Sequence, residues 1–121
     1  GIGLIKDAEA QAPHHPRFGL WATYRATGHL FLLNHADGLI GARQAIDRTP
    51  DYYQPYLTCA WAHVGLGALS DARERVEQAV RMESAPILDS FVVEMKKWSV
   101  NSPLKDSIRA VLDALADIRV D

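Results

Sequence analysis

Apolar side chains recur every three or four residues along nearly the whole chain, which is the spacing of one face of an α-helix. Alternation at every second residue, which would predict a strand, does not compete with this pattern. The clearest stripe lies near the C-terminus and consists of Leu104, Ile108, Val111, Leu112, Leu115 and Ile118. The hydrophobic pattern therefore predicts an all-α fold.

Proline, glycine and short polar segments divide the pattern into separate helices. The predicted helices cover residues 2–11, 17–33, 36–48 and 52–66, a segment with Ser70 as N-cap, residues 86–98, and a last helix that Ser102 caps and Pro103 opens. Pro55 is expected in the first turn of its helix, where proline is tolerated. The helices follow one another through short connections, which predicts antiparallel hairpins.

The sequence also contains an internal repeat. One fixed offset superposes Ala26 on Ala60, His29 on His63, Leu32 on Leu66, Asp37 on Asp71, Gln44 on Gln78 and Ala45 on Ala79. A repeated unit of this size is one supersecondary motif that cannot bury its apolar face alone, so neighbouring units must stack.

On these residues the chain resembles the tetratricopeptide repeat (TPR) family, whose period of about 34 residues equals this offset. The residues that match the family's packing positions are Ala26, Gly38, Ala45 and Pro50 in the first repeat, and Ala60, Gly67, Ala72 and Ala79 in the second. Leu33 stands where the turn glycine is usual, and we expect its neighbour Asn34 to tolerate the left-handed conformation that the turn needs.

The resemblance implies a single TPR-like α-solenoid of antiparallel helix hairpins. Its expected parts are the end of a truncated repeat in residues 1–16, repeats in 17–50 and 51–84, and a closing helix pair in 85–121. The repeat register fails after Ser84, where Glu94 occupies the position of a small residue. Because the chain opens with Gly1 and not with methionine, we expect a fragment of a larger protein.

In TPR proteins the inner face of the first helices lines a groove that holds peptides or neighbouring domains. The matching positions are mostly apolar or aromatic and comprise Leu20, Thr23, Tyr24, Thr27, Phe31, Gln54, Leu57, Thr58, Trp61 and Val64. They lack the lysine, asparagine and arginine residues with which one branch of the family clamps a carboxylate. Tyr24 and Trp61 are the expected anchors of a hydrophobic interface. The alternative is that the chain's own ends cover them.

A looser similarity extends over the whole chain. Residues 14–16, 50–52 and 103–106, each at the start of a predicted helix, look like the C-terminal TPR region of bacterial class III adenylate/guanylate cyclases. Related regions occur in bacterial winged-helix transcriptional regulators. The similarity implies a regulatory or assembly module, with the catalysis or DNA binding of the parent protein outside this fragment.

Charge and composition limit the classes of partner that the chain is expected to bind. Thirteen basic against 15 acidic residues give a net charge of -2, so we expect neither a nucleic acid nor a membrane as partner. The single cysteine cannot close an intramolecular disulfide, which favours a cytoplasmic protein. No metal, cofactor or catalytic residue is predicted, and the chain is not expected to be an enzyme.

Three groups of residues resemble sites that carry chemistry. His14 and His15 are adjacent and are better explained as part of a turn than as metal ligands. Cys59 lies one helical turn from His63 but has no orienting carboxylate within reach. The glycines of residues 65–67 follow a helix and lack the lysine of a phosphate-binding loop.

Two main hypotheses for function remain open. The preferred one is a regulatory module that binds a protein or peptide partner, or its parent's other domains, through the groove. The alternative is a module for self-association as a homodimer, since exposed apolar patches drive association. A small thiol enzyme that uses Cys59 is a minor third possibility.

Overall fold

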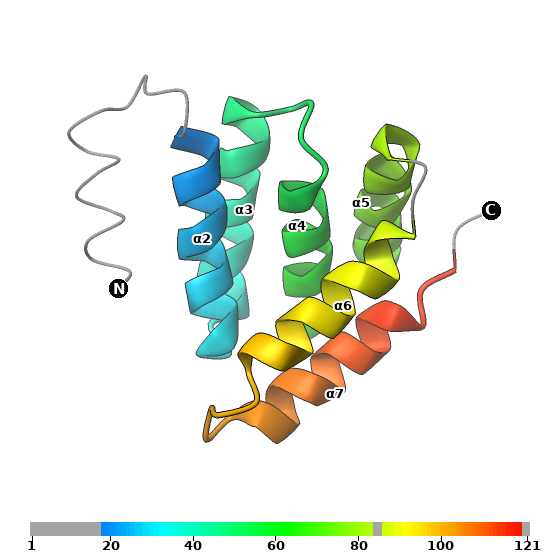
Figure 1. The fold of residues 1–121 in the computed structure, drawn as a ribbon. Helices are drawn as coiled ribbons and strands as arrows, with labels where there is room; N and C mark the ends of the chain where they lie inside the picture. The colour runs from blue at the N-terminus through cyan, green and yellow to red at the C-terminus, as the bar shows by residue number, and fades with distance from the viewer. Residues whose placement is uncertain (1–17, 84–85, 120–121) are drawn as a thin grey trace.

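A computed structural model describes residues 18–83 and 86–119. Every regular element in these residues is an α-helix, which confirms the predicted all-α class (Figure 1). The helices are α2 (Phe18–Phe31), α3 (His35–Arg48), α4 (Gln54–Gly65), α5 (Leu69–Met82), α6 (Ile87–Trp98) and α7 (Lys105–Ala116). The helix expected at residues 2–11 and the pair His14 and His15 lie outside the described residues.

The helices form hairpins in chain order. Helices α2 and α3 pack along each other, α4 and α5 do the same, and α3 contacts α4, so the two hairpins stand side by side (Figure 1). Helices α6 and α7 run obliquely across this row, and α7 also contacts α4. The last pair therefore covers part of one face of the row. Within the described residues, no helix combines the length and the apolar character needed to cross a membrane.

Both hairpins reverse direction through the same turn. The chain adopts positive φ at Leu33 (62°) and again, one repeat period later, at Gly67 (78°). Two nested backbone hydrogen bonds close each turn. In the first turn the Asn34 N–H donates to the His29 carbonyl and the Leu33 N–H to the Leu30 carbonyl. In the second, the Ala68 N–H donates to the His63 carbonyl and the Gly67 N–H to the Val64 carbonyl. This is the Schellman arrangement of a helix C-terminus. The repeat in sequence is therefore also a repeat in backbone structure.

The left-handed residue of the first turn differs from the prediction. Leu33 itself adopts it, whereas Asn34 has a φ of -87°. The hydrogen bonds of the Schellman motif require the left-handed conformation at Leu33, the residue before Asn34, even though leucine does not favour it. The Leu33 side chain is partly buried and packs against the main apolar cluster, which helps to offset the backbone strain.

Gly67 allows a clean test of this turn. A Cβ atom built at Gly67 meets nothing within 4 Å, so the backbone conformation alone penalises a side chain there. We expect Gly67→Ala to lower the free energy of unfolding by about 1 kcal/mol. Gly67→Asn should lower it less, because asparagine tolerates positive φ. Urea denaturation of both variants measures the difference, and an unchanged midpoint for Gly67→Ala would contradict the left-handed turn.

Two predicted helix starts need correction, and one agrees with the structure. Ser70 lies inside α5, which begins at Leu69 without a side-chain cap. Ser102 accepts a hydrogen bond from the Leu104 N–H at 3.1 Å, but α7 begins only at Lys105. Pro55 lies in the first turn of α4, as predicted.

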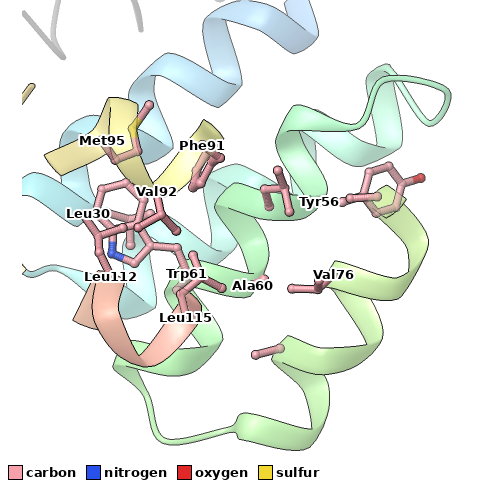
Figure 2. Packing of buried hydrophobic residues seen from close by; sticks show 14 of the residues in the cluster. Leu30, Tyr56, Ala60, Trp61, Val76, Phe91, Val92, Met95, Leu112 and Leu115 are labelled. Atoms are coloured by element: carbon pink, nitrogen blue, oxygen red, sulfur yellow. The ribbon is translucent and has the colours of Figure 1, made fainter. Parts of the chain in front are cut away.

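The core is built around Trp61 of α4 (Figure 2). Its indole makes edge-to-face contacts with Phe31 of α2, at a centroid distance of 5.4 Å, and with Phe91 of α6, at 6.1 Å. The same cluster includes Leu30, Leu57, Val76, Val92, Met95, Ile108, Leu112 and Leu115. Buried side chains from α2, α4, α5, α6 and α7 thus share one apolar interior, and Leu39 and Ile46 of α3 pack against it.

Small residues line the helix contacts. The fully buried alanines include Ala26, Ala45, Ala60, Ala72 and Ala79. A Cβ atom at Gly38 would lie 2.5 Å from Leu30 Cδ2, so glycine is needed for this close approach of α3 to α2. Pro50, in contrast, is exposed in the connection between the hairpins.

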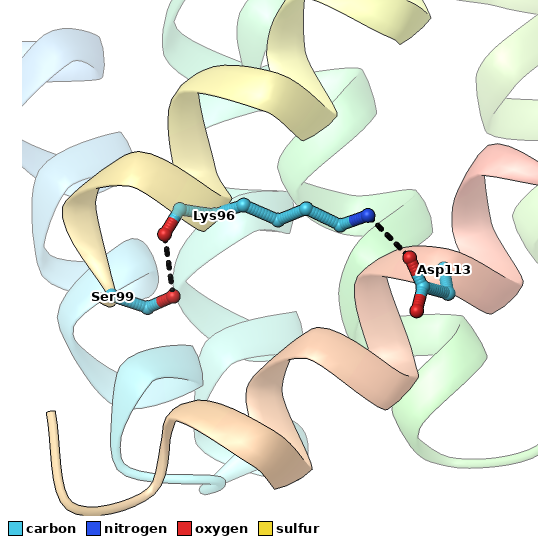
Figure 3. Close-up of polar contacts among 3 residues, drawn as sticks. All are labelled: Lys96, Ser99 and Asp113. Atoms are coloured by element: carbon cyan, nitrogen blue, oxygen red, sulfur yellow. Dashed lines mark hydrogen bonds and ion pairs between the residues drawn. The ribbon is translucent and has the colours of Figure 1, made fainter.

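An ion pair at the surface links the last two helices, and a side-chain hydrogen bond closes the end of α6 (Figure 3). Lys96 of α6 forms an ion pair with Asp113 of α7, and the Ser99 hydroxyl donates a hydrogen bond to the Lys96 carbonyl at 2.9 Å. Surface ion pairs contribute about 0.2–1 kcal/mol, so burial of the apolar faces dominates the docking of α6 on α7.

Candidate binding groove

A groove of about 650 Å³ lies between α2, the start of α4 and α6. Aromatic and aliphatic side chains dominate its lining, with a few polar groups among them. The lining residues are Tyr24, Thr27, Gly28, Phe31, Tyr53, Gln54, Glu83, Ile87, Ser90, Phe91, Glu94, Met95 and Trp98. Its volume falls in the range of about 300–1,000 Å³ that is typical of ligand pockets.

Only part of the groove predicted from sequence lines this cavity. Tyr24, Thr27, Phe31 and Gln54 do so. The fully buried members of the predicted set are Thr23, Leu57, Thr58 and Trp61. Placing these four in an open groove was wrong, because they belong to the interior and a partner cannot reach them. Val64 is half-buried outside the cavity, and the side chain of Leu20 lies outside the described part of the structure.

Trp61 supports the groove from beneath and does not face a partner. Phe31 and Phe91 line the cavity and also contact the Trp61 ring. The expected role of Trp61 as an interface anchor is therefore replaced by a role in holding the floor. Because Phe31 and Phe91 are held by the core, this floor of the groove keeps a fixed shape. Less conformational entropy is therefore lost when a partner binds.

Sequence reasoning missed the contribution of α6. The lining residues from this helix are Ile87, Ser90, Phe91, Glu94, Met95 and Trp98. They follow a spacing of three and four residues and therefore share one helical face. That periodicity is visible in the sequence, but α6 lies beyond the repeat, so no family position places this face opposite α2.

The groove continues into a shallower surface on the outer side of α6. Ser90, Glu94 and Trp98 line both. The shallow surface adds Val93 and Val100, which are exposed by 66% and 60%, beside Trp98 at 71% and Tyr24 of the groove at 49%. Large apolar side chains are thus open to solvent along this face of α6.

Among the described residues that line the groove, the charged side chains are all acidic. They are Glu83, directly after α5, and Glu94 of α6, and both are exposed. A polar edge lies nearby, where the Tyr52 hydroxyl donates a hydrogen bond to Gln54 Oε1 at 2.5 Å. Burial raises the pKa of Tyr52, and the neighbouring Tyr53, Tyr24 and Glu94 add to the shift.

The other residues considered for chemistry, Cys59, His63 and Gly65, lie in the interior or at a helix contact. Cys59 is wholly buried, and burial raises the pKa of its thiol, so it has neither the exposure nor the acidity of a nucleophilic cysteine. Burial lowers the pKa of His63. At Gly65 a Cβ atom would lie 2.2 Å from His35 Cδ2, so the His35 ring packs directly on this glycine and would have to shift to admit a side chain. Among the described residues, no three His, Cys, Asp or Glu side chains are grouped to hold a metal ion.

Comparison of the chain with protein-family models, with curated proteins and with solved structures gives no match. The geometry and charge of the groove are therefore the basis on which a function can be assigned.

Proposed function

We propose that this chain is a TPR-like helical-repeat module that binds a protein segment in the groove between α2, α4 and α6. The observation that carries the proposal is the aromatic lining of a cavity of about 650 Å³ with Trp98 71% exposed at its edge. Tryptophan and tyrosine supply most of the binding energy in many interfaces when they meet a partner's side chain. Such rings are costly to leave in water unless a partner covers them.

The dimensions favour an extended segment. Helix α6 has 12 residues and is therefore about 18 Å long. An extended chain advances about 3.3 Å per residue, so about five or six residues of a partner would span the groove. The Thr27 hydroxyl donates to the Thr23 carbonyl, and Gln54 Oε1 accepts from Tyr52. The Thr27 oxygen can still accept a hydrogen bond, and the Gln54 NH₂ group and the Ser90 hydroxyl remain to orient the partner's backbone.

The solenoid arrangement is part of the proposal. Two turns with the same hydrogen bonds, and buried alanines at matching positions one period apart, support a stack of repeats. In this view α6 and α7 close the stack and narrow its groove. In a larger protein of the cyclase type, the segment bound would come from another domain or from a regulatory partner, and catalysis would reside elsewhere.

Replacement of Trp98 tests the groove. Random octapeptides displayed on phage serve as probes, and selected binders are measured by fluorescence polarisation. We expect Trp98→Ala to weaken binding at least about tenfold, the effect of an interface residue worth about 1.4 kcal/mol. The fold should persist, because this side chain is mostly in solvent.

The matched control is Leu69→Ala, which removes a 57% exposed apolar side chain at the start of α5, outside the groove. It should leave the affinity unchanged. The proposal would be contradicted by binders whose affinity is unchanged in Trp98→Ala, or by a library that yields no binder.

Self-association is the second candidate, and the shallow surface on α6 favours it. Val93, Trp98 and Val100 form an apolar cluster that a second copy could cover. Light scattering across a concentration series distinguishes the two: a dimer that Trp98→Ala dissociates supports self-association, and a monomer at every concentration contradicts it.

A further inference from the structure

We infer that the groove selects segments in which a lysine or arginine lies next to an apolar side chain. This inference rests on the proposed function and names the chemistry of the partner. Its basis is the charge of the lining: among the described residues that form it, Glu83 and Glu94 are acidic and no lysine, arginine or histidine is present.

The two carboxylates are available to a partner. Both residues are exposed, and neither forms an ion pair with another described residue. Glu77 and Asp113, in contrast, are paired with basic side chains on their own or a neighbouring helix. Within residues 18–83 and 86–119, the carboxylates of Glu83 and Glu94 therefore have no ion-pair partner at the place where a bound segment would lie.

The backbone at the C-terminal end of α5 adds negative partial charge at one end of the groove. Glu83 is the C-cap of α5 and directly follows its last turn. The C-terminus of a helix carries about half a negative elementary charge, which attracts cations within its last turn. A cationic side chain near Glu83 would thus meet a carboxylate and a helix C-terminus together.

The aromatic rings suit the same partner. Tyr24 and Trp98 are about half or more exposed, so a guanidinium or ammonium group can approach a ring face in a cation–π contact. The methylene stem of the same side chain can lie along the apolar lining from Phe31, Ile87 and Met95. An acidic segment would instead place its carboxylates beside those of the groove, which disfavours it. Lys97 belongs only to the adjoining shallow surface.

The experiment uses the full chain and a phage library of random octapeptides. Selection against the wild-type chain should enrich lysine and arginine over aspartate and glutamate. One selected binder is then synthesised together with a counterpart in which each lysine or arginine is replaced by glutamate. We expect the basic peptide to bind at least about tenfold more tightly at low ionic strength, with a smaller ratio at about 0.5 M salt, where charges are screened.

Two variants place the preference in the groove. The double variant Glu83→Gln, Glu94→Gln should reduce the affinity ratio of the two peptides several-fold, whereas Glu74→Gln, which removes an exposed carboxylate of α5 outside the groove, should leave it unchanged. Circular dichroism verifies that each variant is folded.

The outcomes separate this inference from the proposed function. Binders without charge bias that remain sensitive to Trp98→Ala overturn the inference and leave the groove in place. A basic preference that Glu74→Gln weakens as much as the double variant also overturns it, since overall charge would then be the cause. A library without any binder overturns both.

Discussion

Replacing Trp61 by alanine is expected to lower the free energy of unfolding by about 3–5 kcal/mol, the range for large-to-alanine changes of buried aromatic residues. Trp61 is wholly buried and contacts rings from both α2 and α6. Alanine would leave a cavity at the junction of the hairpins with the closing pair. The ring contacts contribute beyond buried area, because edge-to-face pairs add about 0.5–1.5 kcal/mol each.

Urea denaturation followed by far-ultraviolet circular dichroism measures this loss. Trp98→Ala is the matched control, since it removes the same side chain from an exposed position and should change stability little. Trp61→Phe should cost much less than alanine, because Trp61 Nε1 is buried without a hydrogen-bond partner among the described residues. If Trp61→Ala unfolded at the wild-type denaturant concentration, the closing pair could not be packed on Trp61.

Introducing leucine at Gly41 is expected to destabilise the chain by about 3 kcal/mol, at the upper end of the range for overpacked cores. A Cβ atom there would lie 3.0 Å from Ala26 Cβ and 3.3 Å from Ala26 Cα. The second of these atoms is backbone and cannot rotate away. A leucine would therefore force α3 away from α2 along the first hairpin.

Thermal unfolding of Gly41→Leu beside Gly41→Ala separates crowding from helix propensity. The alanine variant gains up to about 1 kcal/mol of propensity over glycine, which offsets part of its tighter contact. We therefore expect a small change for alanine and a large fall in melting temperature for leucine. Similar melting temperatures for the leucine variant and the wild type would mean that α2 and α3 do not approach closely at this position.

The hairpins could be predicted from sequence because their determinants are local. Glycine and proline end the helices, and buried alanines recur at positions of the repeat period, so the bounds of α3, α4 and α6 fall close to their predicted ranges. Leu33 and Ser70 show where local reasoning fails. The hydrogen bonds of the turn fix the left-handed position, and α5 begins without a side-chain cap.

The groove was harder to predict because it depends on packing between distant segments. Tyr24 and Phe31 could be placed by their positions in the first repeat, and both line the cavity. Glu94 and Trp98 could not, since α6 follows no repeat and its position depends on its packing against α7 and on the contact of Phe91 with Trp61. Packing between helices also removed Leu57 and Trp61 from the surface. Knowledge of the repeat thus reveals one wall of the groove and leaves the opposite wall undetermined.

The contrast between Trp61 and Trp98 also supplies two optical probes. Trp61 is fully buried and Trp98 is 71% exposed, so their indoles lie in media of very different polarity. Indole emission shifts to longer wavelength in water, and collisional quenchers such as iodide reach only exposed rings. The variant Trp21→Phe removes the third tryptophan. In this background, iodide quenching reports whether the surface around Trp98 is covered. The blue-shifted emission of Trp61 reports whether the interior is folded. Occupancy and unfolding can then be distinguished in one unlabelled sample.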